Sequence, residues 1–220
     1  MLSQYSAVDL DGLIEKMHQH GFCIMDNFVT NATALALASE CVMLQDHAQF
    51  HEASTGRFAA KINDGIRGDS IYWLNANNAS DAQKAYFTQM ESLRLRLNQQ
   101  LYLGLFALES HFAIFPAGAG YKKHLDQFTA NNDDHLPRRQ ISCILYLNQD
   151  WKNHDGGHLR LYLNQNNEGE SNEPSKLNKS QLDISPTGGR LVIFLSDTFY
   201  HAVLPAIRCR TSLTGWFLTR

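Results

Sequence analysis

The sequence has little that would suit a disulfide framework, a nucleic-acid surface or a membrane. Its four cysteines are scattered and include no C-x-x-C pair, a pattern typical of reduced thiols in the cytosol: Cys23, Cys41, Cys143 and Cys209. The formal net charge of −3 offers no basic face for nucleic acid. No apolar run reaches the length of a membrane span, and the first residues lack the charged and apolar regions of a signal peptide. We therefore expect a cytoplasmic protein that binds neither nucleic acid nor membrane.

The length of the sequence suits one domain, residues 1–220. Its first and second parts differ in the pattern of their apolar residues. In the first part, residues 1–107, apolar spacing and capping residues predict helices over about 7–21, 30–50 and 80–103, with strands at 22–29 and 67–74. From about Leu108, short runs rich in Ile, Leu, Tyr and Phe alternate with turn residues. About eight short strands of this kind predict a sandwich or barrel over 108–220. The polar segment 163–180 is expected to be a solvated loop.

The stretch GYKKHLDQF, residues 120–128, holds the first candidate for chemistry. In an extended segment residues i and i+2 share a face, so His124 and Asp126 can converge on one point. Such a pair plus one distant histidine makes a facial triad that suits non-haem Fe(II) with open coordination positions. Alone the pair is weak evidence, because a chain with ten histidines produces about one such match by chance.

A second candidate lies far downstream, in DTFYHAVLPAIRCRTSLTGWF. His201 opens one predicted strand and Arg210 lies on the next. If these strands are neighbours, Arg210 reaches into the barrel behind a metal, where its planar fork would bind a terminal carboxylate through both oxygens. Ser212 shares the face of Arg210 and can add a hydroxyl. An isolated arginine would be better explained as a surface residue, but the joint spacing favours the functional interpretation.

Several motifs together resemble one family. FPAGAGYKKHLD, CILYLNQDW followed by GGHLRLY, GRLVIFLSD and HAVLPAIRCRTSLTGWF occur in that order between Phe112 and Phe217. They resemble the 2-oxoglutarate- and Fe(II)-dependent prolyl hydroxylases, in the branch of the oxygen-sensing enzymes and their bacterial relatives. The resemblance implies an α+β fold that is mostly β-structure. Its core would be a double-stranded β-helix (jelly roll), and N-terminal helices would support this core.

The resemblance also assigns roles to single residues. It makes His124, Asp126 and His201 the iron ligands, and it makes Arg210 the anchor for the distal carboxylate of 2-oxoglutarate. The residues that it places around the cosubstrate or the metal are Tyr146, Leu159, Val203, Trp216 and Tyr121. Core packing explains Tyr146, Leu159, Val203 and Trp216 equally well, and both explanations can hold at once.

The implied activity is hydroxylation of a prolyl residue in a protein, giving hydroxyproline, succinate and CO2. It would use Fe(II), 2-oxoglutarate and O2, with ascorbate as a candidate reductant. The expected partner is a protein with an exposed proline loop, such as a translation factor or regulator. Two alternatives stay open: the same chemistry on a free amino acid or small metabolite, and a barrel that binds ligand or senses oxygen without turnover.

The motif IRGDSIYWL resembles a strand that follows a substrate-covering loop in this branch of the family. We expect Asp69 in this motif to pair with Arg139 and so hold the covering loop, residues 52–66, to the barrel rim.

Overall fold

The computed structural model describes residues 9–53, 66–127, 137–163 and 180–220. The predicted covering loop 52–66 and the predicted polar loop 163–180 lie almost entirely outside the described residues.

Three helices form where the sequence predicts them, each begun by a capping side chain: α1 (Leu10–His20), α2 (Asn31–Asp46) and α3 (Asp81–Leu101). Asp9, Thr30 and Ser80 each accept a hydrogen bond from a backbone N–H in the first turn of the helix that follows. Two 3₁₀ turns are η1 (Ala76–Asn78) and η2 (Asn153–Asp155). In the described part of the chain, no helix has the length and apolarity needed to cross a bilayer.

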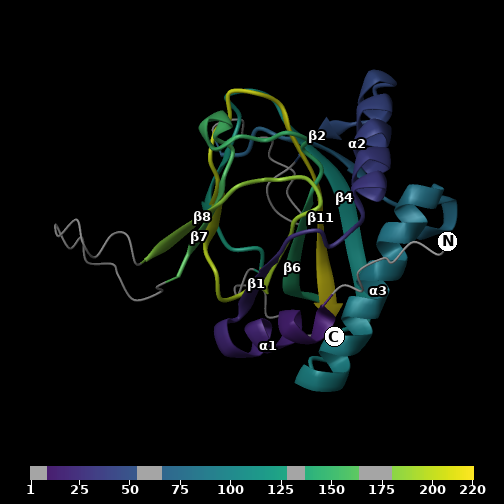
Figure 1. Cartoon of the computed structure of the whole chain (residues 1–220), viewed down its shortest axis with the longest axis vertical. Helices are drawn as coiled ribbons and strands as arrows, with labels where there is room; N and C mark the ends of the chain where they lie inside the picture. Colours follow the sequence, from purple (N-terminus) through teal and green to yellow (C-terminus); the bar gives the residue numbers. More distant parts are fainter. Residues whose placement is uncertain (1–8, 54–65, 128–136, 164–179) are drawn as a thin grey trace, which may run out of the picture.

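The strands form two antiparallel sheets that face each other (Figure 1). The larger sheet has the order β1-β9-β6-β11-β4-β3-β2, with bounds Phe22–Met25, Leu191–Leu195, Arg138–Tyr146, Arg210–Thr219, Ala107–Phe115, Ser70–Trp73 and His51–Glu52. The smaller has the order β5-β10-β7-β8, with bounds Tyr121–His124, His201–Val203, Leu159–Tyr162 and Gln181–Ile184. Most neighbours in the sheets, such as β1 with β9 and β11 with β4, come from distant parts of the sequence, and this arrangement confirms the predicted jelly roll.

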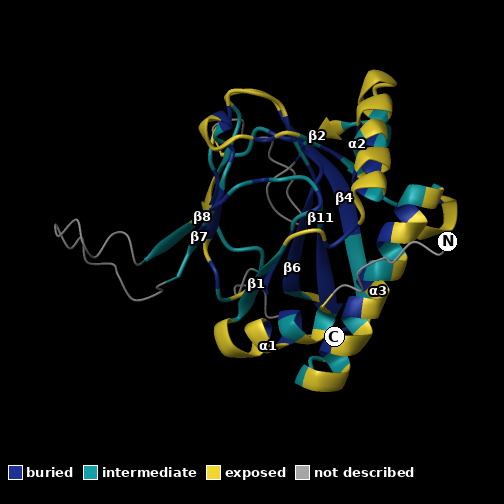
Figure 2. Cartoon of the chain, viewed as in Figure 1, coloured by how far each residue is buried: buried dark blue, intermediate teal, exposed yellow. Residues whose placement is uncertain are grey.

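Alternation along the strands separates a helix-facing layer from a barrel interior. On β11, Leu213 and Phe217 join the core cluster that includes residues of all three helices. The helices lie along one side of the larger sheet, with their exposed residues turned outward (Figure 2). The other face of β11 carries Arg210, Ser212 and Trp216, and all three residues are buried. The polar residues singled out on this strand therefore face the space between the sheets.

A second apolar cluster fills that space. It joins Tyr146 of the larger sheet to Leu159 and Val203 of the smaller sheet, together with other buried residues such as Phe115 and Phe194. The two sheets thus enclose a buried, largely apolar interior, and polar groups inside it are costly unless they find partners.

Candidate active site

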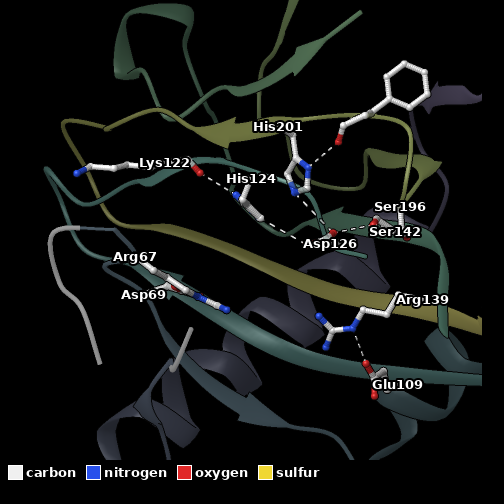
Figure 3. Close-up of polar contacts among 11 residues, drawn as sticks. Arg67, Asp69, Glu109, Lys122, His124, Asp126, Arg139, Ser142, Ser196 and His201 are labelled. Carbon is white, nitrogen blue, oxygen red and sulfur yellow. Dashed lines mark hydrogen bonds and ion pairs between the residues drawn. The ribbon is translucent and has the colours of Figure 1, made fainter. Parts of the chain in front are cut away.

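The three predicted metal ligands lie together at one edge of the smaller sheet. His124 ends β5, and His201 begins β10 directly opposite it in the antiparallel pairing. Asp126 follows two residues after His124 and turns toward both histidines (Figure 3). Its Oδ1 lies 3.5 Å from Nε2 of His124, and its Oδ2 lies 3.6 Å from Nε2 of His201. One ligand atom from each residue falls within 4.8 Å of the others, so the group could hold a metal ion.

Backbone carbonyls orient the two imidazoles. Nδ1 of His124 lies 2.7 Å from the carbonyl oxygen of Lys122, and Nδ1 of His201 lies 3.2 Å from that of Phe199. A carbonyl oxygen only accepts, so each Nδ1 carries the proton and donates it. Each Nε2 is therefore left with its lone pair directed toward the other ligands, as a metal site requires.

The Asp126 carboxylate is held by Ser142, a residue that sequence reasoning missed. Ser142 on β6 donates to Oδ2 at 2.6 Å, and its hydroxyl lies 2.9 Å from that of Ser196. Burial acts to raise the pKa of Asp126, but His201, His124 and Ser142 outweigh it and hold that pKa below its usual range. Burial also lowers the pKa of His201 to about 4, so its imidazole is neutral at physiological pH. Both groups are thus in the protonation state that binds a divalent cation.

Arg210 lies deep in the interior, at the start of β11. Its guanidinium carbon sits 5.0 Å from the ring centroid of Tyr146 and 5.1 Å from that of Phe115. Its Nε donates to the carbonyl oxygen of Gly157 at 3.1 Å. Among the described residues, no carboxylate forms an ion pair with it. A buried cation without a counter-ion is costly, so the site suits an anionic ligand.

The surroundings of Arg210 fit the carboxylate of a cosubstrate. The Tyr146 hydroxyl is buried and has no hydrogen-bond partner among the described residues. Burial raises the pKa of Tyr146, which keeps its hydroxyl protonated and able to donate to an anion. Ser212 is buried and pairs with Tyr146 across the β6–β11 ladder, but its hydroxyl lies 3.4 Å from that of Thr214. Arg210 and Tyr146 thus place side by side a guanidinium and a hydroxyl that have no anionic partner among the described residues.

The remaining predicted residues divide between the two ends of this interior. Leu159 and Val203 are buried and pair with each other across β7 and β10. The Tyr121 ring stacks on His124 with 3.6 Å between ring centroids, at the end of the interior where His124, Asp126 and His201 lie. Trp216 pairs with Ser142 across the ladder, so it also lies toward that end, and its buried indole N–H has no described partner.

Strand β6 connects the two ends. Ser142 and Tyr146 lie four residues apart on its inner face, about 13 Å at the usual rise of a strand. Ile144 lies between them and belongs to the apolar cluster. The site therefore has one end at Asp126, where a metal ion could bind (the metal end), one end at Arg210, which suits a carboxylate, and an apolar wall between them.

The expected pair of Asp69 with Arg139 is wrong. Both carboxylate oxygens of Asp69 accept hydrogen bonds from Arg67, at 2.5 and 2.9 Å (Figure 3). Arg139 instead donates to Glu109 at 2.8 Å and lies 3.5 Å from the ring centroid of Trp216. The reason is the strand order, because β11 and β4 both lie between β6 and β3. The Arg139 side chain on β6 therefore packs on Trp216 of β11 and reaches Glu109 of β4, which is nearer than Asp69. Arg67, two residues before Asp69 in an extended segment, is the nearer cation for that carboxylate.

Comparison with known proteins places this geometry in a family. Residues 110–218 match the pattern of the 2OG-Fe(II) oxygenase superfamily. A crystal structure of a prolyl-4-hydroxylase from Pseudomonas putida is 38% identical, with a TM-score of 0.79 over 96% of this chain and 99% of that chain. A prolyl hydroxylase from Trichoplax adhaerens is 27% identical, with a TM-score of 0.79 over 94% of this chain and 88% of that chain.

Curated relatives give the same family over a part of their length. Egl nine homolog 1 of Homo sapiens is 29% identical over 94% of this chain and 46% of the relative. The chain spans about half the length of the first such relatives. The Trichoplax enzyme is in complex with a peptide fragment of the hypoxia-inducible factor oxygen degradation domain.

Proposed function

Because the chain belongs to the 2OG-Fe(II) oxygenase superfamily, we propose that it hydroxylates a prolyl residue in a protein substrate, using 2-oxoglutarate and O2. The observation that carries the proposal is the two-ended site. A His-Asp-His group at one end and an unpaired buried guanidinium at the other are what a metal-chelating dicarboxylate needs. The products are hydroxyproline, succinate and CO2.

Each end has a defined task in this reaction. His124 and His201 would hold Fe(II) through Nε2, and Asp126 would hold it through a carboxylate that Ser142 keeps in place. Arg210 and Tyr146 bind the distal carboxylate of 2-oxoglutarate, while Leu159 and Val203 exclude water from the space between. When bound, Fe(II) with 2-oxoglutarate and O2 supplies the oxidative decarboxylation and the oxygen transfer. The protein's own residues contribute the position of the two ends and an apolar interior.

The substrate is a protein with an exposed proline loop, such as a translation factor or regulator. The peptide bound to the Trichoplax relative supports a protein substrate over a free amino acid. The four free cysteines, three of them buried, support a reducing location, and we propose the cytoplasm. We also propose that residues 1–220 act as one catalytic domain, with the jelly roll over 108–220 and the helices and first strands of 1–107 supporting it.

The experiment compares cells that express the wild-type protein with cells that express His201→Ala. Mass spectrometry of co-purified proteins searches for prolines that carry one added oxygen atom. Purified enzyme with Fe(II), ascorbate and 2-oxoglutarate is then assayed for succinate release with the matching peptide. Turnover stimulated only by free amino acids would favour a metabolite substrate. No succinate under any condition would favour a barrel that binds ligand without turnover.

A further inference from the structure

Two segments that are bound together through their backbones lie beside Arg210. The segment 151–157 leads into β7, and the segment 204–208 connects β10 to β11. Gly157 N–H donates to Pro205 O at 3.0 Å, and Ile207 N–H donates to Asp155 O at 2.9 Å. These bonds make one wall from two loops, and Gly157 lies on its inner side.

The carbonyl of Gly157 is aimed at Arg210 by its backbone conformation. Gly156 and Gly157 both have positive φ, at 74° and 67°. A Cβ on Gly157 would lie 3.0 Å from the Trp151 ring and 3.3 Å from Cδ of Arg210. A side chain at position 157 would therefore be strained and would crowd the arginine. The sequence supplies glycine where the wall passes closest to the guanidinium.

Asp155 ties this wall together with its side chain. It is a buried carboxylate that accepts from the Lys152 backbone N–H at 2.8 Å and from Nη1 of Arg208 at 3.4 Å. Arg208 in turn lies 4.9 Å from the ring centroid of Trp151, whose indole N–H donates to Gly156 O at 3.0 Å. One carboxylate thus connects the turn before Gly157 to the loop that leads into Arg210.

We propose that Asp155, acting through Gly157, is a positioning residue for Arg210. The Gly157 carbonyl takes the Nε–H of Arg210, so the guanidinium presents its Nη1–Nη2 edge to the cosubstrate carboxylate beside the Tyr146 hydroxyl. Loss of Asp155 frees the turn, and Gly157 no longer fixes that orientation. The proposal rests on the proposed function, because it assigns Arg210 to 2-oxoglutarate.

The test substitutes Asp155 and follows the 2-oxoglutarate dependence of succinate release. We expect Asp155→Ala to raise KM for 2-oxoglutarate about fivefold and Asp155→Asn about twofold, because Asn keeps one acceptor for Lys152. The value of kcat at saturating 2-oxoglutarate and the metal content should stay at wild-type levels. Asp183→Asn is the matched control, since both carboxylate oxygens of Asp183 accept from Arg160 on the outer side of the smaller sheet. It should leave KM unchanged.

Binding without turnover separates this inference from the activity on which it rests. The Kd of 2-oxoglutarate is measured by calorimetry with Mn(II) in the absence of O2, and it should rise by the same factors. An unchanged KM and Kd in the Asp155 variants would overturn the proposal, as would an equal rise in Asp183→Asn. If Asp155→Ala does not fold, Arg208→Gln decides: a rise in KM of about twofold supports the proposal and no rise overturns it. Wild-type protein that fails to bind 2-oxoglutarate would instead contradict the proposed function, and the inference with it.

Discussion

The two ends of the site solve the problem of buried charge in different ways. At the metal end, the Asp126 carboxylate accepts a hydrogen bond from Ser142 and lies beside two neutral histidines, whose Nε2 lone pairs leave its negative charge to be balanced by a cation. At the other end, Arg210 has only the Gly157 carbonyl and two aromatic rings, and its positive charge has no described counter-ion. The metal end is therefore completed by a cation, whereas the Arg210 end is completed by an anion. Changes at the first end should abolish chemistry, and changes at the second should alter affinity.

The largest expected effect is at the metal end. His201→Ala removes an Nε2 ligand from a group of three and leaves too few donors to retain Fe(II). We expect loss of bound metal and of all succinate release, at any 2-oxoglutarate concentration. Metal analysis of the purified protein and the succinate assay measure both.

His18→Ala, a change of an exposed histidine on α1, is the control and should keep both metal and turnover. Full metal occupancy in His201→Ala would show that this histidine is not a ligand.

The next effect tests the opposite end. Arg210→Ala removes a charge-assisted contact and leaves the bound carboxylate unpaired, at a cost of about 2–5 kcal/mol. KM for 2-oxoglutarate should rise at least about tenfold, since about 1.4 kcal/mol is one decade. Metal content should stay near wild type, which is the reverse of the result for His201→Ala.

Arg210→Lys should recover only part of the affinity, because an ammonium lacks the planar fork. A 2-oxoglutarate titration that is unchanged in Arg210→Ala would remove the cosubstrate from this end of the site.

A smaller effect comes from the larger sheet. Ser142→Ala deletes the hydroxyl that donates to Asp126, while the two histidines remain. Loss of such an outer partner lowers metal affinity by about tenfold, the lower end of the usual range, because all three ligands remain. Competition with a chelator measures it.

Ser110→Ala is the matched control. Ser110 is also buried and its hydroxyl lies 3.0 Å from that of Tyr86, but it faces the helices. Equal metal loss in both variants would mean that Ser142 acts through the general stability of the sheet.

The sequence predicts one kind of contact well. Alternation along a strand depends only on the chain itself, so the residue order alone places His124 with Asp126, and Arg210 with Ser212, on common faces. The same rule places Ser142 on the face of Tyr146, and that signal could have identified the serine. Its contact with Asp126 still required the packing of β6 against the turn after β5.

Contacts that depend on strand order were not predictable in the same way. The pair of Asp69 with Arg139 was wrong because β11 and β4 lie between the strands that carry them. Glu109 and Trp216, which Arg139 meets instead, come from these two intervening strands. The contact of Arg210 with the Gly157 carbonyl could not be predicted for another reason. Every residue has a backbone oxygen, and the direction of this one depends on a positive φ that the sequence does not specify.

The smallest expected effect concerns the region beyond the metal end, where Arg139 lies between Glu109 and the Trp216 ring. Both partners of the ion pair are partly exposed, so solvent screens it and Glu109→Gln should lower the free energy of unfolding by less than about 1 kcal/mol. Arg139→Ala should lower it more, because it also removes the packing of the guanidinium on Trp216. Urea denaturation of the two variants compares them directly, and KM for 2-oxoglutarate should be unchanged in Glu109→Gln because Arg210 lies at the far end of β11. If Glu109→Gln is as unstable as Arg139→Ala, the ion pair and not the ring contact holds Arg139 in place.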